Sequence, residues 1–262
     1  MRSVYLTPLY TFLVLLSFFQ CPQLFTEVEV IIPFIVRKIP HAANAFTQGL
    51  AIDEVNNVLY ESTGLYGQSC VRQIDLEDGK ILKQYNLPLH LFGEGIALAH
   101  NRLIQLTWNE KTALVYSKLN FDLLKTFSYT GEGWGLCFDE GLNLLWMSDG
   151  TSLLQQRNPD TFKIKSRLQV HLEGKEVNFL NDLVCTGRTL YVNVWGKDYI
   201  YRIDKYTGEV TGKIDASNLL SKKERARLSP EAILNGIAYQ KSSQTFFLTG
   251  KLWPYIYEVS FK

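Results

Sequence analysis

A five-fold repeat constrains this chain more than any other feature of its sequence. Five short turns, flanked by apolar residues, each place one variable residue directly before a glycine or, in the fourth copy, before Asp182. By subtraction, these leading residues are separated by 46, 40, 47 and 54 positions, and a repeat of this length is typical of a propeller or a solenoid. The five leading residues are Gln48, Glu94, Trp134, Asn181 and Asn235.

Strand-like runs recur in step with these turns. A run rich in β-branched, aliphatic and aromatic residues ends 13 or 14 positions after each leading residue, as Leu103–Thr107 does after Glu94. A third run follows in every copy, and a fourth follows a Gly-containing turn in two of them. Four strands in each of five units predict an all-β fold, a five-bladed β-propeller with four-stranded antiparallel blades. A β-sandwich whose turns are similar by accident is the alternative.

The fifth unit lacks a visible outer strand. Three strand-like runs precede Lys262, whereas the strand-like segment Pro33–Ile39 stands unused ahead of the first unit. We expect this N-terminal strand to complete the last blade, because pairing the two ends of the propeller leaves no exposed blade edge.

The first 25 residues are typical of an export signal, ahead of one propeller domain over residues 26–262. A basic start at Arg2 precedes a mostly apolar stretch, Val4–Phe19, that is short for a membrane span. We therefore expect an exported protein that is periplasmic, secreted or N-terminally anchored outside the cytoplasm. Membrane contact is expected only through this segment if it stays uncleaved. Cleavage of the segment and lipid attachment at Cys21 both stay open.

The charge balance argues against a nucleic-acid partner. Lys and Arg number 27 and Asp and Glu number 26, so the concentrated basic face that a phosphate backbone requires is not expected. We expect a monomer, although the sequence carries no direct signal of oligomeric state.

The number of cysteines argues against a complete disulfide framework. Beyond Cys21 there are three, Cys70, Cys137 and Cys185, and an odd number excludes complete pairing. Free buried thiols are expected at Cys137 and Cys185, which occupy similar positions in two units. No Cys-x-x-Cys or His-x-x-His spacing occurs, so a zinc site is not expected.

A propeller brings the five leading residues together at one mouth of its central channel. The flanks of these turns repeat while the leading residue differs from copy to copy, which is typical of a functional site on a repeated scaffold. Trp108, Trp134 and Trp195 fall at the same mouth and are expected to line an apolar pocket. Trp146 lies within a strand and is expected in the core.

Glu94 is the one carboxylate among the leading residues. Indoles around it would exclude water, and desolvation raises a carboxyl pKa, so Glu94 could exchange a proton near neutral pH. A structural carboxylate that accepts backbone N–H bonds is the alternative. Lys251 adds an ammonium group, and Gln48, Asn181 and Asn235 add amides. This set suits addition to a carbonyl group in which the substrate supplies its own nucleophile.

Distinctive motifs extend from Phe46 to the C-terminal region: FTQGL at 46–50, ESTGLYG at 61–67, FGEG at 92–95, GWGL at 133–136, SDGT at 148–151, LNGIA at 234–238 and TGKLWP at 249–254. Together they resemble the plant and bacterial type of glutaminyl cyclase, the glutamine cyclotransferase family of five-bladed propellers. The resemblance implies that an N-terminal glutaminyl residue of a peptide or protein becomes pyroglutamyl, with release of ammonia. One departure is Asp182, where the family often has glutamate.

The resemblance also implies roles for single residues. Glu94 would be the acid/base residue, and Lys251 or Asn181 would stabilise the developing oxyanion. The reaction requires no metal and no cofactor, unlike the zinc-dependent animal type, although a structural cation on the propeller axis would leave no sequence signal. The expected catalytic residues are Glu94, Lys251 and Asn181. The expected substrate-binding residues are Phe46, Gln48, Trp108, Trp134, Trp195 and Asn235.

Two other functions stay open. A metal-dependent propeller lactonase or hydrolase would use Glu94, Asn181, Asn235 and Asp149 as ligands of calcium or magnesium, although indoles around a hard cation argue against it. A non-catalytic peptide-binding propeller would use the aromatic mouth alone.

Overall fold

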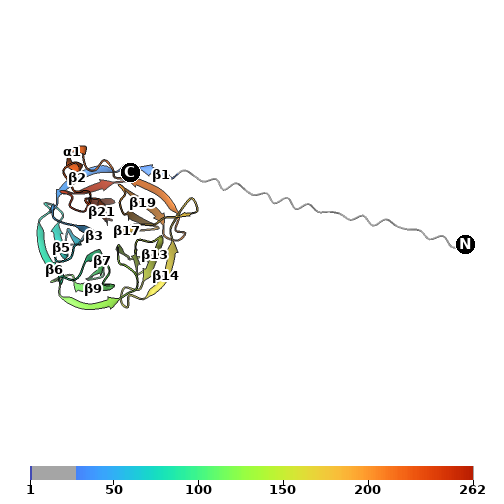
Figure 1. The fold of residues 1–262 in the computed structure, drawn as a ribbon, viewed down its shortest axis with the longest axis horizontal. Coiled ribbons are helices and arrows are strands. Elements are labelled where there is room, and N and C mark those ends of the chain that lie inside the picture. The colour runs from blue at the N-terminus through green and yellow to red at the C-terminus, as the bar shows by residue number, and fades with distance from the viewer. Residues whose placement is uncertain (2–27, 262) are drawn as a thin grey trace.

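The fold is a ring of five blades around a central axis (Figure 1). The structure, a computed structural model, describes Met1 and residues 28–261. Apart from Met1, the expected export segment therefore lies outside the described residues, and so does Cys21. The five-bladed propeller with four antiparallel strands in each blade is confirmed, and the β-sandwich alternative is not.

Strands follow one another outward in each blade, so that the first strand of every blade lies next to the axis. Blade one contains β3 (Thr47–Asp53), β4 (Val58–Thr63), β5 (Cys70–Asp75) and β6 (Ile81–Asn86). Blade two contains β7 (Gly93–Ala99), β8 (Arg102–Thr107), β9 (Thr112–Ser117) and β10 (Leu123–Ser128). Blade three contains β11 (Leu136–Asp139), β12 (Leu144–Met147), β13 (Leu153–Arg157) and β14 (Ile164–Gln169). Blade four contains β17 (Leu180–Thr186), β18 (Thr189–Val194), β19 (Tyr199–Asp204) and β20 (Val210–Asp215).

Blade five is completed from the N-terminal side of the chain, as predicted. Its first three strands are β21 (Leu234–Gln240), β22 (Thr245–Gly250) and β23 (Tyr255–Ser260), and β2 (Phe34–Pro40) pairs antiparallel with β23. One feature was not predicted. The short strand β1 (Glu29–Ile31) adds to the outer edge of blade four, where it runs parallel to β20, so residues 29–40 cross from one blade to the next.

The inner strands are buried on both faces, polar residues such as Gln105 included. Each blade is packed between two neighbours, and in β8 every residue from Leu103 to Thr107 is buried. Outer strands alternate instead, as in β6, because one of their faces meets water. Trp146 is fully buried between blades three and four, in contact with a cluster that includes Leu180 and Leu183, and this confirms its assignment to the core.

The expectation of free thiols at Cys137 and Cys185 is wrong. The two residues form a disulfide that joins β11 of blade three to β17 of blade four, with Cα atoms 6.2 Å apart. Equivalent positions on the first strands of adjacent blades lie side by side, and that distance suits a disulfide. Cys70 is free and buried.

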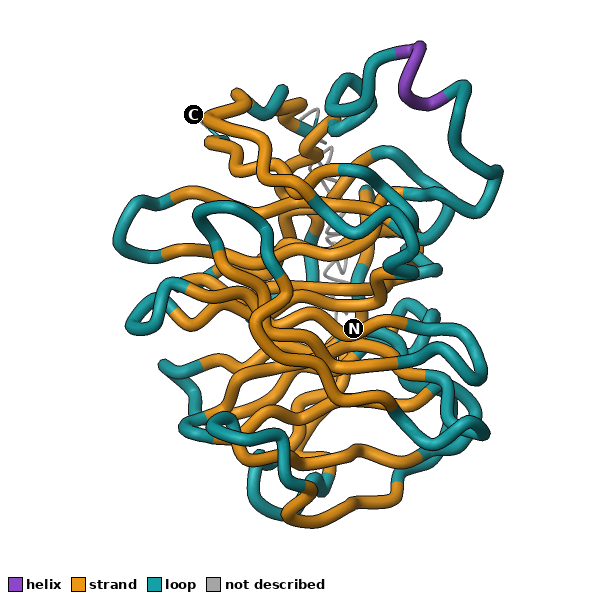
Figure 2. Tube along the Cα trace, turned by 90° about the vertical axis from the view of Figure 1, so that its left-hand side faces the viewer, coloured by secondary structure: helices purple, strands orange, loops and turns teal. Residues whose placement is uncertain are grey.

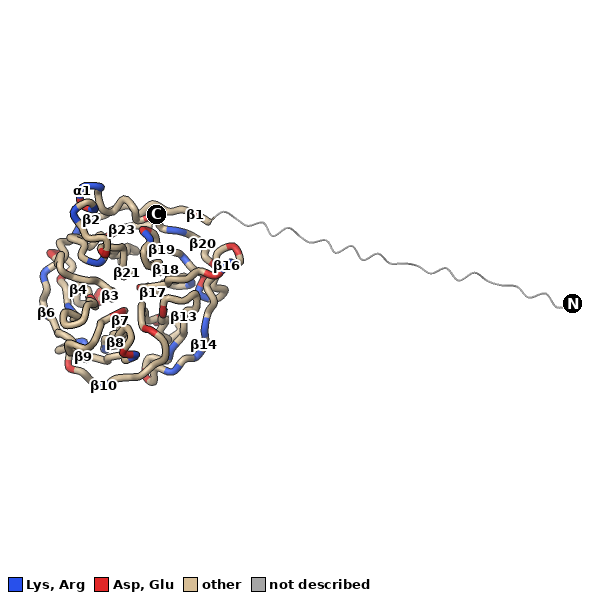
Figure 3. The backbone as a smooth tube through the Cα atoms, viewed as in Figure 1, with Lys and Arg blue, Asp and Glu red and all other residues tan. Residues whose placement is uncertain are grey.

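Two small elements lie outside the blades. The hairpin β15 (His171–Leu172) and β16 (Lys175–Glu176) follows blade three, and α1 (Lys222–Arg225) lies on the long connection between blades four and five. Figure 2 shows α1 at one edge of a molecule that is otherwise strands and loops. Ser221 caps this helix, and no helix of the described residues is long and apolar enough to cross a membrane. Acidic and basic residues both occur around the ring (Figure 3).

Candidate active site

The first strands bring four of the five leading residues into one connected set. Gln48 Nε2 donates to Glu94 Oε1 over 3.0 Å, and Asn235 Nδ2 lies 3.3 Å from Gln48 Oε1. The backbone N–H of Gly95 donates to the Trp134 carbonyl oxygen at 2.6 Å. Side chains that are 187 residues apart in sequence therefore meet at one mouth of the channel.

Glycine after the leading residue permits this close approach. A Cβ at Gly95 would lie 2.6 Å from the backbone oxygen of Trp134, which no side chain tolerates. In the fourth blade Asp182 stands at this position, and its Oδ2 accepts bonds from the backbone N–H groups of Leu50 (3.3 Å) and Ile237 (2.9 Å). Burial raises the pKa of Asp182 well above its ordinary value, although these N–H donors act in the opposite direction. Asp182 thus ties three blades together behind the site.

Glu94 is 5% exposed at the start of β7. Burial raises its pKa well above the ordinary value; Lys251 opposes the shift, and the carboxylates of Glu132 and Asp182 add to it. No backbone N–H of the described residues donates to the Glu94 side chain, so the bonds expected of a purely structural carboxylate are not found. The arrangement favours a group that gains and loses a proton.

Lys251 approaches the same space from the end of β22. Its side chain is 5% exposed, and its Nζ lies 4.5 Å from the centroid of the Phe46 ring, a cation–π contact. Burial lowers the pKa of Lys251, whereas the negative charges of Glu94 and Glu231 raise it. A buried ammonium opposite a buried carboxyl is suited to stabilise negative charge that develops on a bound substrate.

An aromatic wall surrounds these groups, and Phe92 is at its centre. The Phe92 ring meets Phe46 edge-on at 6.4 Å, Tyr66 at 5.4 Å and Trp108 at 5.5 Å between centroids. Reasoning from the sequence did not single out Phe92 or Tyr66. Phe92 stands two residues before Glu94, and Phe46 and Phe179 hold the same position in two other copies, so the repeat alone did not distinguish it.

One carboxylate holds two of the predicted tryptophans. The indole N–H groups of Trp108 and Trp134 both donate to Glu132 Oε2, each at 2.8 Å. The Trp134 ring also covers Gly150, where a Cβ would lie 2.7 Å from the indole. Sequence reasoning missed Glu132, and the available signal was its place directly before the Gly-Trp-Gly turn.

Trp195 stands apart from the other two indoles. It is 49% exposed, its ring centroid lies 6.1 Å from that of Phe179, and among the described residues no ring contact joins it to Trp108 or Trp134. The structure therefore places Trp195 on the rim of the mouth rather than in the packed wall.

Asn181 and Asn235 are buried, and each leaves its Oδ1 without a hydrogen-bond partner among the described residues. Asn235 Nδ2 donates to the backbone oxygens of Thr47 and Gln48 and so joins blade five to blade one. A buried, unpaired acceptor is costly, about 1–3 kcal/mol, unless a ligand supplies a donor. Both amides are thus available to a bound molecule.

The metal-site alternative gains no support from the placement of its proposed ligands. Asp149 accepts bonds from Thr151 and Gln155, and Glu94 accepts from Gln48. Within residues 28–261 no group of three or more His, Cys, Asp or Glu side chains is arranged to hold a metal ion. That no metal is required stays a prediction.

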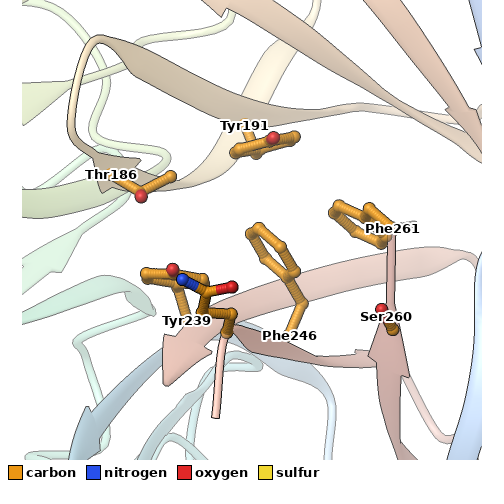
Figure 4. A pocket seen from close by; sticks show the side chains of 7 residues that line it. Thr186, Tyr191, Tyr239, Phe246, Ser260 and Phe261 are labelled. Atoms are coloured by element: carbon orange, nitrogen blue, oxygen red, sulfur yellow. The ribbon is translucent and has the colours of Figure 1, made fainter. Parts of the chain in front are cut away.

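Two cavities lie away from this mouth. A channel cavity of about 1210 Å³ is lined by the later residues of the first strands, Ile52, Leu98 and Phe138 among them, and so lies toward the opposite mouth. Figure 4 shows a smaller pocket of about 210 Å³ between blades four and five, where Tyr191, Phe246 and Phe261 gather. The predicted site residues line neither of them.

Fold and site together define a class of protein: a five-bladed propeller enzyme with a buried carboxyl of raised pKa near an aromatic wall at one channel mouth. The chain belongs to the glutamine cyclotransferase family, whose sequence model matches residues 10–261. The motif resemblance is thereby confirmed.

Two relatives support this assignment. The chain is 39% identical over 241 residues to a glutaminyl-peptide cyclotransferase of Arabidopsis thaliana, across 90% of this chain and 72% of the relative. The crystal structure of Myxococcus xanthus glutaminyl cyclase is also 39% identical and superimposes with a TM-score of 0.81, covering 89% of this chain and 97% of that one.

Proposed function

We propose that this protein is a glutaminyl-peptide cyclotransferase, which converts N-terminal glutaminyl residues of peptides or proteins to pyroglutamyl residues and releases ammonia. The observation that carries the proposal is the buried Glu94, which is hydrogen-bonded to Gln48 and lies near Lys251 and a cluster of aromatic rings. Family membership and the names of the two relatives point to the same reaction.

In the proposed mechanism the substrate supplies its own nucleophile. The free α-amine attacks the γ-carboxamide carbon, and the new C–N bond closes a five-membered lactam. Glu94, as carboxylate, takes a proton from the attacking nitrogen. It returns that proton to the carboxamide nitrogen, which leaves as ammonia when its C–N bond breaks. Its raised pKa makes Glu94 a stronger base than an exposed carboxylate and keeps proton return within reach at neutral pH.

The other site residues orient the substrate and stabilise charge. Lys251 and the Asn181 amide stabilise the oxyanion that forms on the carboxamide oxygen. Gln48 and Asn235 hold Glu94 in place and offer hydrogen bonds to the folded-back substrate. The aromatic wall around Phe46 excludes water, and because ring closure is intramolecular, positioning supplies much of the rate.

We further propose that the chemistry uses no metal and no cofactor, and that the protein works as an exported monomer. The disulfide between Cys137 and Cys185 supports an exported location, because disulfides persist in oxidising compartments. The apolar stretch Val4–Phe19 would direct export as a signal peptide or remain as an anchor.

The first test is ammonia release from a Gln-initiated dipeptide by the purified protein, with and without a strong chelator. Release that survives the chelator is expected. Release abolished by the chelator would overturn the metal-free mechanism and favour ligands such as Asn181 and Asp149. No release at all would leave a peptide-binding propeller.

A further inference from the structure

We propose that Glu132 is a specificity residue that binds the α-ammonium group of the substrate, a role that rests on the proposed function. Glu132 lies between β10 and β11, two residues before Trp134, and it is partly buried at the same mouth as Glu94. Its charge reaches the site, because it contributes to the raised pKa of Glu94.

The orientation of the Glu132 carboxylate is fixed by one of its two oxygens. Oε2 accepts both indole N–H groups, from Trp108 directly after β8 of blade two and from Trp134 just before β11 of blade three, each at 2.8 Å. Two bonds at one oxygen, from side chains on different blades, leave the carboxylate little freedom to rotate. Glu132 therefore also positions the two indoles that form the pocket wall.

The second oxygen of Glu132 is left for a ligand. No described residue donates a hydrogen bond to Oε1, and no Lys, Arg or His of residues 28–261 forms an ion pair with this carboxylate. Glu132 is only partly buried, and its Oε1 is not among the buried unpaired atoms of the described residues, so this oxygen is accessible to a ligand that brings a positive charge.

The substrate of the proposed reaction carries such a charge. An α-amino group has a pKa of about 7.7–8.0, so at neutral pH it is mostly an ammonium ion. Glu110, a further carboxylate near Glu94, is already occupied, because its oxygens accept from Tyr66 and from the backbone of Phe92. Lys251 would repel an ammonium group, so the substrate enters with its N-terminus toward Glu132 and its carboxamide toward Lys251.

This orientation restricts the substrates to chains with a free N-terminus. Glu132 acts in binding and does not enter ring closure, which is performed by the neutral amine after loss of one proton to water. An acylated N-terminus lacks the positive charge and would bind weakly. The acidic mouth thus selects the same group that the chemistry requires as nucleophile.

The test compares two non-reacting ligands by calorimetric titration: a methionyl peptide, which has a free ammonium group, and the matching pyroglutamyl peptide, which has none. Glu132→Gln retains an oxygen for both indoles and removes the charge. We expect it to weaken binding of the methionyl peptide about 10- to 100-fold and to leave the affinity for the pyroglutamyl peptide within about twofold. Glu140→Gln, the same change at the opposite mouth, should alter neither affinity.

Equal losses for both peptides would show that Glu132 only positions the indoles, and no loss for either would remove it from the site. If Glu132→Gln does not fold, the wild-type protein provides a second measurement. Raising the salt concentration should then weaken binding of the methionyl peptide selectively, because ions screen the charge pair, and an equal effect on both peptides would overturn the proposal. Ammonia release by the wild type tests the proposed function separately from these affinities.

Discussion

Gln48 donates to Glu94 across the boundary between blades one and two, and this bond links the amide of one leading residue to the carboxyl of the next. The amide of Asn235, from blade five, lies 3.3 Å from the oxygen of the same Gln48 side chain. The orientation of the proposed proton carrier therefore depends on three blades at once. A rigid ring holds it where a flexible loop could not.

Glu94→Gln should reduce kcat for a Gln-initiated dipeptide by at least about 100-fold, because the amide can neither accept nor return a proton. Gln48 can still bond to the new side chain, so the fold should persist. Steady-state ammonia release gives kcat, and Glu140→Gln on the opposite mouth is the matched control. A rate within a few-fold of wild type would refute the role of Glu94.

Lys251→Met should shift the acidic limb of the kcat/KM profile toward higher pH. Lys251 lowers the pKa of Glu94, so its removal raises that pKa further and postpones ionisation of the carboxyl. A loss of rate of about 10- to 1000-fold on the plateau is also expected if the ammonium stabilises the oxyanion. An unchanged acidic limb would show that another group sets the pH dependence.

Stability should depend on pH through a buried pair behind the site. His41 Nε2 lies 2.8 Å from Glu61 Oε1 and joins the end of β2 to blade one. Burial disfavours both charged forms, yet the attraction between the partners prevails, so the pKa of His41 is raised from 6.5 and that of Glu61 is lowered from 4.5.

The pH dependence of stability follows from the directions of these two pKa shifts. The contribution of His41 is fully present below pH 6.5 and is lost as pH rises through its folded pKa, whereas that of Glu61 is present above pH 4.5 and is lost as pH falls through its folded pKa. The pair should therefore stabilise most between these values. Urea unfolding at a series of pH values should show His41→Gln to lose stability mainly in that window, and a loss independent of pH would contradict the assignment.

Replacing both Cys137 and Cys185 with serine should lower the free energy of unfolding by about 2–4 kcal/mol, because the bridge closes a long loop in the unfolded chain. Thermal melts with and without a reductant measure this effect. A reductant should destabilise the wild type and leave the double variant unchanged. Equal melting of the oxidised and reduced wild type would mean that the bridge does not form in solution.

The fold and the centre of the site could be predicted from the sequence, because the repeats determine both the number of blades and the residues that meet at the axis. Five copies in step specify the ring, and the ring specifies which residues meet, so Gln48, Glu94 and Asn235 could be named before their contacts were known. The crossing of residues 29–40 from blade four to blade five could be only half predicted. The fifth unit showed only three strand-like runs, so its outer strand had to come from elsewhere. The fourth unit already showed four such runs, so nothing indicated the additional strand β1.

The remaining site residues could not be predicted, because their roles depend on where their side chains point and not only on their place in the repeat. Glu132 and Phe92 lie in the flanks, where the repeat suggested packing, and only the geometry shows that Glu132 faces two indoles. Trp195 has the right position, but its exposure depends on how its loop turns outward. The odd cysteine count excludes only complete pairing. The disulfide was missed because buried cysteines are usually free, although Cys137 and Cys185 occupy similar positions in adjacent blades.

Closure of blade five by β2 has a consequence for how the molecule is made. Translation produces β2 early, yet its partner β23 leaves the ribosome only after every other strand of the ring. Until then β2 has an unpaired edge, and Lys251, which lies between β22 and β23, is the last of the proposed site residues to be made. A nascent chain that ends before β23 would thus carry Glu94 and Lys251 in an unsealed ring, so the proposed site is held in place only when the last blade closes.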